Sequence, residues 1–196
     1  MTTVSRLILV RHGQTEWAKL GRHTGRTDIE LTEQGRVEAV AARATLEDRE
    51  ISAVFSSPLR RARETAELVG LEPEITLDDR LLEWDYGPSE GQRTVDMREK
   101  IENWSVWTHP DTTAESADEV GNRVDDFIDN ALDGLDGDVA IFAHGHLLAV
   151  FIARWLQLPA IEGRRFKLDT ATVSLLDFHR EDRVIRALNH RCGDRL

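Results

Sequence analysis

Short, uninterrupted apolar runs recur along this chain and predict the strands of a buried sheet. Residues 7–10, 54–55 and 139–143 are apolar at consecutive positions, a pattern typical of parallel strands that are covered on both faces. Further extended segments are expected at residues 75–82, 172–178 and 184–188.

Between these runs, apolar residues recur every three or four positions, which predicts helices with one buried face. Thr32 is a suitable N-cap for a helix that extends through Ala44. Ser57 is expected to cap the next helix, with Pro58 in its first position and Gly70 at its end. The remaining helices are expected at residues 95–107, 115–132 and 148–155.

The alternation of strands and helices predicts the fold class: an α/β domain of three layers, α/β/α, with a mostly parallel central sheet. The chain of 196 residues is long enough for one such domain and shows no internal repeat or linker. We therefore expect a single domain over residues 1–196, with a helical cap or insertion at about residues 88–115.

Composition limits the partners of this domain. Acidic residues outnumber basic ones, 36 against 25, and give a formal net charge of −11. Nucleic acids and anionic membranes bind clustered Lys and Arg, so we expect neither as a partner, whereas the sequence is compatible with a homodimer. The chain lacks both a run of roughly 20 apolar residues and the apolar centre of a secretory signal, which favours a cytoplasmic location. The lone cysteine, Cys192, excludes an intramolecular disulfide and is expected to be a bystander.

Basic residues follow two of the buried runs at the points where the strands end. Arg11 and His12 come directly after residues 7–10, His144 comes directly after residues 139–143, and a glycine follows each histidine. Open α/β proteins bind their ligands past the carboxyl ends of the strands. If the two strands are neighbours, about 4.8 Å apart, both imidazoles face one pocket. A guanidinium beside imidazoles suits a phosphate group.

Four sequence blocks extend this observation along the chain. They are RHGQTEW from Arg11, SSPLRRA from Ser56, EWDYG from Glu83 and HG from His144. In this order and spacing the blocks resemble those of the histidine phosphatase superfamily, the phosphoglycerate mutase-like proteins. The resemblance covers nearly the whole chain and is closest to the acid phosphatase and sugar-bisphosphate phosphatase members.

The resemblance implies a metal-independent phosphomonoesterase that forms a phosphohistidine and needs no cofactor. His12 is then the nucleophile, and Glu83 protonates the leaving oxygen. Arg11 and Arg61 hold the phosphoryl oxygens, and His144, if protonated, adds a third donor. The expected substrate is a small-molecule phosphate monoester, such as a sugar phosphate or a phosphoglycerate.

Other residues near the blocks are weaker candidates for binding the substrate. Gly13 is expected to let a ligand approach the backbone. Trp104 and Trp107 are expected in the core rather than against a ligand. The candidates for substrate binding are Gly13, Gln14, Arg22, Thr24, Gly145 and His146. Four histidines fit no block and are assigned no role: His23, His109, His179 and His190.

Three alternative functions use the same residues. His12, His144 and His146 offer a three-histidine zinc site, but the neighbouring Arg11 and Arg61 disfavour a further cation, so no metal is expected. A cofactor-dependent phosphoglycerate mutase is the second alternative, although mutase relatives carry extra basic sequence after the glutamate block. An inactive phospho-ligand-binding member is the third, and it would not need a nucleophile and a proton donor together.

Three alanines depart from the family pattern. Ala18 and Ala149 stand where many relatives have Asn and Arg, and each loses a polar group that could touch substrate. The resemblance therefore does not decide whether the substrate carries a second phosphate. Ala114 stands where the family usually has Gly, which leaves the role of the middle loop open.

Overall fold

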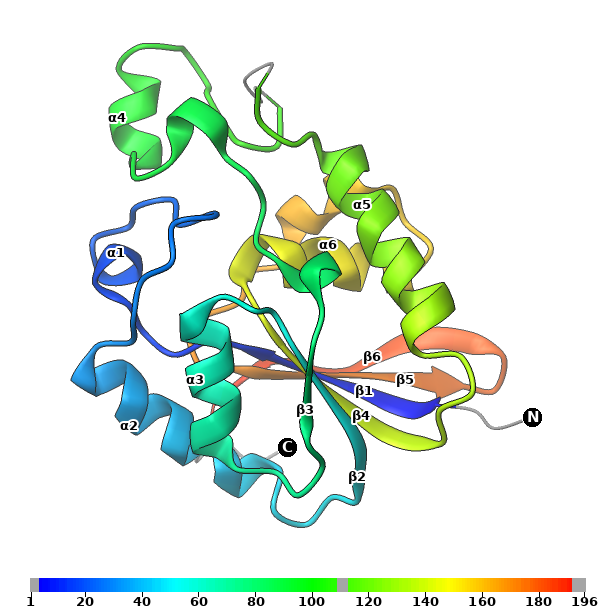
Figure 1. The fold of residues 1–196 in the computed structure, drawn as a ribbon. Helices are drawn as coiled ribbons and strands as arrows, with labels where there is room; N and C mark the ends of the chain where they lie inside the picture. The colour runs from blue at the N-terminus through cyan, green and yellow to red at the C-terminus, as the bar shows by residue number, and fades with distance from the viewer. Residues whose placement is uncertain (1–3, 109–112, 192–196) are drawn as a thin grey trace.

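A six-stranded sheet forms the centre of the computed structural model, which describes residues 4–108 and 113–191 (Figure 1). The strands lie in the order β3-β2-β4-β1-β5-β6. Their bounds are β1 Val4–Arg11, β2 Ile51–Ser56, β3 Ile75–Leu77, β4 Gly137–Ala143, β5 Val173–His179 and β6 Asp182–His190. The pairings among β1 to β4 are parallel, whereas β5 and β6 form an antiparallel hairpin beside β1. The mostly parallel sheet predicted from the sequence is confirmed.

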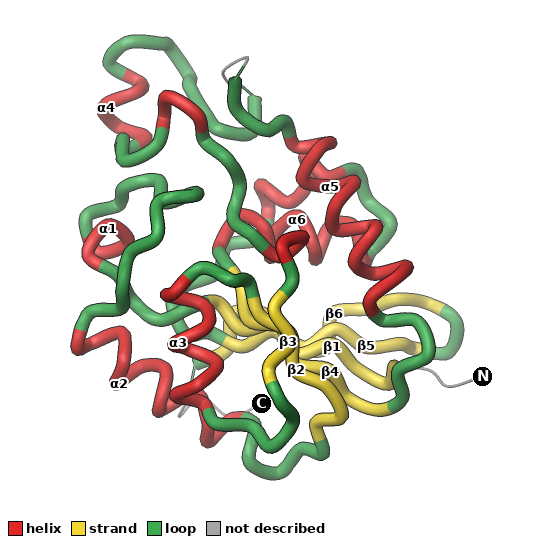
Figure 2. Tube along the Cα trace, in the orientation of Figure 1, coloured by secondary structure: helices red, strands yellow, loops and turns green. Residues whose placement is uncertain are grey.

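Helices cover both faces of this sheet and complete the three layers (Figures 1 and 2). α2 (Glu33–Ala42) and α3 (Arg60–Val69) pack on one face, and α5 (Ala117–Asp126) and α6 (Gly145–Trp155) pack on the other. α5 continues into a π-helical turn at Phe127–Ala131. The shorter elements are α1 (Glu16–Lys19), α4 (Thr94–Arg98) and 3₁₀ turns at Arg43–Thr45, Asp79–Leu81, Gly87–Ser89 and Ala160–Arg165. Within the described ranges, no helix combines the length and the apolar character that crossing a membrane requires.

The first strand shows why an uninterrupted apolar run marks the centre of the sheet. Leu7 and Leu9 belong to the core cluster under α5 and α6, whereas Ile8 and Val10 belong to the cluster under α2 and α3. All four side chains are fully buried or nearly so. Successive side chains of a strand point to opposite faces, so a strand covered on both sides needs apolar residues at every position.

The register of the two central strands brings the two histidines together. β1 pairs with β4 so that Arg11 lies opposite Ala143, and the His12 N–H donates to the Ala143 carbonyl at 3.0 Å. Arg11 and Ala143 are thus paired across the two strands, and the residues that follow them, His12 and His144, lie side by side. This confirms that the two histidine-bearing strands are neighbours and parallel.

The start of α3 differs from the expected cap. The helix begins at Arg60 after Leu59, and no side chain of Leu59 or Ser57 caps it in the expected way. Instead the Arg60 N–H donates to the Asp28 carboxylate at 2.7 Å. The prediction that Ser57 caps and Pro58 begins this helix was wrong, because a carboxylate from a distant loop supplies the acceptor and the Ser57 hydroxyl contacts His144.

Two expected elements are shorter than their patterns indicated. The extended segment at residues 75–82 is a strand only to Leu77, since Asp78 caps a 3₁₀ turn there. The helix expected at residues 95–107 ends at Arg98, whose Nε donates to the Trp104 carbonyl, and Asn103 turns the chain with a φ of 56°. The cap at about residues 88–115 stays a prediction. His109 and Cys192 lie outside the described residues.

Candidate active site

His12 is buried at the end of β1 and is held in one tautomer. Its side chain is 3% exposed, and Nδ1 lies 2.7 Å from the Gly13 carbonyl oxygen. A carbonyl only accepts, so Nδ1 carries the proton and Nε2 holds a lone pair. Burial, reinforced by Arg61 and Arg11, lowers the His12 pKa well below its ordinary value. The imidazole is therefore neutral and nucleophilic at neutral pH.

Arg11 comes from the last position of the same strand. One terminal nitrogen donates to the Leu168 carbonyl at 2.5 Å. The glycine at position 145 leaves room for this guanidinium, because a Cβ there would lie 3.2 Å from its Nε and Cζ. Gly145 thus serves the site by its lack of a side chain, and it also lines the cavity described below.

Arg61 reaches the site from the first turn of α3 and is fully buried. Its terminal nitrogens donate to the carbonyls of Thr27, Thr24 and Gly25 at 2.9, 3.0 and 2.8 Å. A buried guanidinium needs such partners, and neutral carbonyls satisfy its N–H groups without cancelling its charge. The cation is therefore rigid and remains available to an anion.

His144 ends β4 and lies beside His12, with ring centroids 5.2 Å apart. Burial first, and then Arg61, lowers the His144 pKa well below its ordinary value, which favours the neutral imidazole over the protonated one that was considered as a third donor. Its Nε2 lies 2.8 Å from the Ser57 hydroxyl. A hydroxyl donates one hydrogen bond and accepts two, so its bond from the Leu59 N–H leaves both directions open at His144. We assign the hydroxyl proton to Nε2 and the His144 proton to Nδ1, because Nδ1 has no partner among the described residues and a donor there suits an anion beside His12.

Three buried nitrogens of these side chains lack a hydrogen-bond partner among the described residues: Arg11 Nε, Arg61 Nε and His144 Nδ1. Both guanidiniums act on the His12 pKa, and the His144 ring contacts the His12 ring, so all three surround His12. A buried donor without a partner costs about 1–3 kcal/mol. Together with the two guanidinium charges, these groups favour an anion bound at His12, although of the three side chains only Arg11 lines the cavity described below.

Glu83 reaches the same place from the segment that follows the Asp79–Leu81 turn. Its Oε1 accepts from the N–H groups of Leu147 and Trp84 at 2.9 and 3.0 Å, and its Oε2 accepts from the His146 N–H at 3.1 Å. Two of these donors are the otherwise unsatisfied N–H groups at the start of α6. The amino end of α6 therefore fixes the orientation of the carboxyl group.

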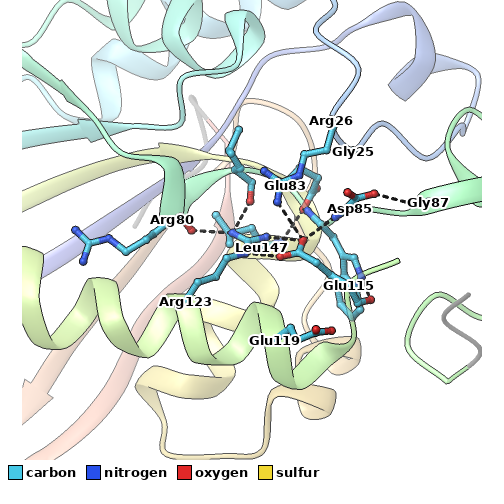
Figure 3. A network of polar contacts seen from close by, with 12 residues as sticks. Gly25, Arg26, Arg80, Glu83, Asp85, Gly87, Glu115, Glu119, Arg123 and Leu147 are labelled. Atoms are coloured by element: carbon cyan, nitrogen blue, oxygen red, sulfur yellow. Dashed lines mark hydrogen bonds and ion pairs between the residues drawn. The ribbon is translucent and has the colours of Figure 1, made fainter. Parts of the chain in front are cut away.

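A polar network holds the segment that carries Glu83 (Figure 3). Arg123 of α5 donates to the carbonyls of Arg80 and Leu82 at 2.7 and 2.6 Å, and its Nε donates to Glu115 at 2.9 Å. Glu115 in turn accepts from the Asp85 N–H at 2.7 Å. The chain is thereby tied to α5 on both sides of Glu83.

A cavity of about 330 Å³ opens in front of these groups, and Arg11, His12, Glu83 and Gly145 form its catalytic end. Arg61 and His144 do not line the open space, since both are fully buried beside His12. Among the weaker candidates, the cavity wall contains Arg22, Thr24 and His146. The sequence blocks thus meet around one cavity, as the positions of the strand ends indicated.

Two of the weaker candidates point elsewhere. A Cβ on Gly13 would lie 2.3 Å from the Gly35 carbonyl, so this glycine allows β1 to approach α2 and not a ligand. The Gln14 side-chain oxygen accepts from the Thr32 hydroxyl at 3.1 Å, and Gln14 is not part of the cavity wall. Both were expected to bind substrate, and in both cases packing against the start of α2 accounts for the residue.

Several residues of the cavity wall were not found from the sequence. His23 lines the cavity, bonds Thr94 through Nε2 and has its pKa lowered to about 4, chiefly by burial. Tyr86 and Trp107 line it too, and both rings contact the His146 ring, whereas Trp104 is buried in the core as expected. The segment after α6 adds further wall residues, which are Arg164, Phe166, Lys167, Leu168 and Asp169. The basic cluster in this segment was the available signal, although no sequence block includes it.

The residues do not favour the zinc alternative. Among the described residues, no group of three or more His, Cys, Asp or Glu side chains is arranged to hold a metal ion. His12 Nδ1 is bonded to Gly13, His144 Nε2 to Ser57, and His146 Nδ1 to the Tyr86 hydroxyl. Each of these bonds engages one ring nitrogen only. Zinc is therefore disfavoured by the lack of such a ligand group among the described residues and by the two neighbouring guanidiniums.

Comparison with known proteins agrees with this geometry. The model of the histidine phosphatase superfamily (branch 1) matches residues 7–191, and the chain belongs to this superfamily. It is 42% identical over 187 residues to an acid phosphatase of Mycobacterium tuberculosis, covering 93% of this chain and 91% of the relative. It is 34% identical over 185 residues to the sedoheptulose 1,7-bisphosphatase of Saccharomyces cerevisiae, covering 78% and 68%. A solved structure of a Mycobacterium tuberculosis open reading frame matches with a TM-score of 0.90 at 40% identity, covering 96% of this chain and 99% of that one.

Proposed function

We propose that this protein is a metal-independent phosphomonoesterase that hydrolyses small phosphorylated metabolites through a phosphohistidine on His12. One observation carries the proposal: a neutral imidazole with a free Nε2 faces a cavity, and three buried N–H donors beside it have no partner among the described residues. The names of the relatives, an acid phosphatase and a sugar bisphosphatase, support the same reaction class.

In the first step, His12 Nε2 attacks phosphorus and the bond from phosphorus to the leaving oxygen breaks. Arg11, Arg61 and His144 hold the phosphoryl oxygens as charge develops on them. Glu83 gives a proton to the leaving oxygen, so that an alcohol departs instead of an alkoxide. The Gly13 carbonyl keeps the proton on Nδ1 and stabilises the positive charge of the phosphohistidine.

In the second step, water attacks the phosphohistidine, the bond from phosphorus to nitrogen breaks and phosphate leaves. Glu83, now ionised, takes a proton from the attacking water. His12 returns to the neutral state in which it began. Each group thus ends as it started, and no cofactor is consumed.

The segment after Glu83 favours hydrolysis over phosphoryl transfer between phosphoglycerates. In mutase relatives this part of the chain supplies basic residues. Here Arg93 pairs with Asp96, and Arg98 donates to the Trp104 carbonyl. In the described part of residues 84–116, no Arg or Lys lines the cavity.

Glu83→Gln tests the proposed roles, because it keeps the shape of the side chain but removes the proton. With a sugar phosphate, kcat should fall on the order of 10²-fold or more, whereas p-nitrophenyl phosphate, whose leaving group needs little protonation, should lose about tenfold or less. Steady-state release of phosphate measures both. Glu102→Gln, an exposed carboxylate outside the cavity, is the matched control. Equal losses on the two substrates would remove Glu83 from the role of general acid, and a wild-type protein without turnover would favour the binding-protein alternative.

A further inference from the structure

The cavity wall beyond the four sequence blocks is basic. Arg22, Arg164 and Lys167 line it, and Asp169 is the one carboxylate among the described wall residues outside the catalytic end. This concentration of cations occurs on a chain with a formal net charge of −11. A local excess of positive charge on an acidic protein requires an explanation at that site.

Asp169 does not neutralise this group. Its carboxylate is engaged by the Asn189 side chain at 3.2 Å, by Lys167 at 3.2 Å and by Arg191 at 3.4 Å. One negative charge is thus divided between two cations, one of which is outside the cavity wall. Lys167 is also 85% exposed, so its ammonium can turn toward a ligand.

The charges of Arg164 and Arg22 are neutralised by neighbouring carboxylates even less than that of Lys167. Arg164 shares the single carboxylate of Glu162 with Arg165, and its own contact is the looser one at 3.4 Å. Arg22 donates to the neutral Gly91 carbonyl at 3.1 Å and forms no ion pair with the described residues. Neither cation is needed for the phosphoryl group at His12, which Arg11 and Arg61 already face.

We propose that Arg22, Arg164 and Lys167 form a second anion subsite, so that the substrates carry two anionic groups on one small molecule. The phosphoryl group that is hydrolysed sits at His12, and a second phosphate or a carboxylate sits against the three cations. This inference rests on the proposed phosphatase function and names its substrate class. A volume of about 330 Å³ is in the range of cavities that bind small molecules.

The subsite also bears on the departure at Ala149. That side chain is 1% exposed within α6 and is not part of the cavity wall. In this chain the wall receives its positive charge from Arg22 and from the segment after α6 instead.

The subsite is tested with substrates that differ in their second anionic group and with protein variants that differ in one arginine of the cavity wall. The probes are fructose 1,6-bisphosphate, 3-phosphoglycerate and fructose 6-phosphate, whose second anions are a phosphate, a carboxylate and none. The wild-type protein should show a higher kcat/KM for at least one of the doubly anionic probes than for fructose 6-phosphate. Whichever of the two is preferred identifies the second anion as a phosphate or a carboxylate.

Arg164→Gln and its neighbour Arg165→Gln form a matched pair, because both arginines contact Glu162 but only Arg164 lines the cavity. In Arg164→Gln the preference for the doubly anionic probe should fall about tenfold, mainly through KM, since a charge-assisted hydrogen bond is lost. In Arg165→Gln the preference should stay within about twofold of wild type. An equal fall in both variants, or equal kcat/KM values for all three probes in a wild type that hydrolyses them, would overturn the subsite.

A binding measurement separates this inference from the proposed function. Calorimetric titration of the His12→Gln protein with the same probes reports affinity without turnover. Tighter binding of a doubly anionic probe that weakens in the His12→Gln/Arg164→Gln protein supports the subsite even if wild type hydrolyses none of the probes. Equal affinity for all three probes overturns the subsite even if p-nitrophenyl phosphate is hydrolysed.

Discussion

Single hydrogen bonds decide the chemistry of the two central histidines. The Gly13 carbonyl can only accept, so it places the proton of His12 on Nδ1 and directs Nε2 at the substrate. We assign the corresponding role for His144 to the Ser57 hydroxyl: when it donates to Nε2, the imidazole proton is on Nδ1 and can be donated to the phosphoryl group. In the proposed mechanism, two neutral imidazoles of similar burial thus act differently, one as nucleophile and one as donor.

Ser57→Ala tests the second assignment, with Ser56→Ala as its matched control. Both serines are fully buried, but the Ser56 hydroxyl donates to the Ser57 carbonyl and not to a histidine. Ser57→Ala should lower kcat about tenfold, since His144 then loses the partner that fixes its tautomer. Nitrogen-15 chemical shifts of the histidines should report the Nδ1–H form of His144 in wild type and in Ser56→Ala, and a changed tautomer in Ser57→Ala. An unchanged tautomer in Ser57→Ala would contradict the positioning role.

Candidate site residues that lie at the end of a strand could be predicted from the sequence. Arg11, His12 and His144 directly follow or end apolar runs, and adjacent parallel strands carry them to one edge. His23 and Lys167 could not be found in this way, because loops of irregular conformation place them against the cavity. The role of Gly13 was mistaken, since a glycine pattern does not show whether a ligand or another backbone, here that of Gly35, approaches it.

At the scale of elements, α5 and α6 together hold Glu83, the proposed proton donor. α6 offers its first N–H groups to Glu83, and α5 ties the flanking segment through Arg123 and Glu115 (Figure 3). The catalytic carboxyl therefore has a fixed position although it lies on a segment without regular structure. Rigid support of this kind is what positions a catalytic group within a fraction of an ångström.

Arg123→Met should loosen this support while keeping most of the side-chain volume. We expect kcat for a sugar phosphate to fall on the order of tenfold, and p-nitrophenyl phosphate to be affected less, because its leaving group depends less on Glu83. Arg154→Met is the control: Arg154 pairs with Asp125 between α5 and α6, outside the cavity wall. If both variants lose stability equally and neither shows a leaving-group dependence, Arg123 acts on folding alone.

The long periodic and apolar segments were predicted correctly at this scale, and the short ones were not. β1, β4 and α6 carry patterns that tertiary contacts reinforce, whereas α2 buries Ala39 and Ala42 and leaves Val37 and Val40 exposed. The start of α3 was misplaced because Asp28, which is 32 positions away in the sequence, supplies the acceptor. The same holds for the Arg123 network, whose members come from separate parts of the chain and form no pattern along it.

For the whole molecule, the buried imidazoles make stability depend on pH. His12, His144 and His146 have pKa values below their ordinary value, and that of His23 is lowered from 6.5 to about 4, in each case mainly by burial. The unfolded chain therefore binds protons near pH 6.5 that the folded chain does not yet bind. The contribution of these imidazoles to the free energy of unfolding is therefore fully present above about pH 7 and is lost as the pH falls toward 4.

Urea denaturation in phosphate-free buffer at several values between pH 7.5 and 5 measures this dependence. Each group that is neutral when folded and protonated when unfolded contributes a slope of about 1.4 kcal/mol per pH unit. His23→Gln, which can still bond Thr94, should remove about one such contribution. A free energy of unfolding that stays constant or rises as the pH falls through this range would contradict the burial of neutral imidazoles.

The central claim is that catalysis passes through a covalent phosphohistidine on His12, and trapping this species tests it most directly. Protein mixed with a ³²P-labelled sugar phosphate and quenched in alkali should carry label on the peptide that contains residues 11–17, whereas acid quenching should release it, since a phosphoramidate is acid-labile. His12→Ala should lose the label and reduce kcat on the order of 10³-fold or more, and His179→Ala, an exposed histidine at the end of β5, should keep both. Label retained in His12→Ala, or turnover by the wild-type protein without alkali-stable label at any quench time, would contradict the account.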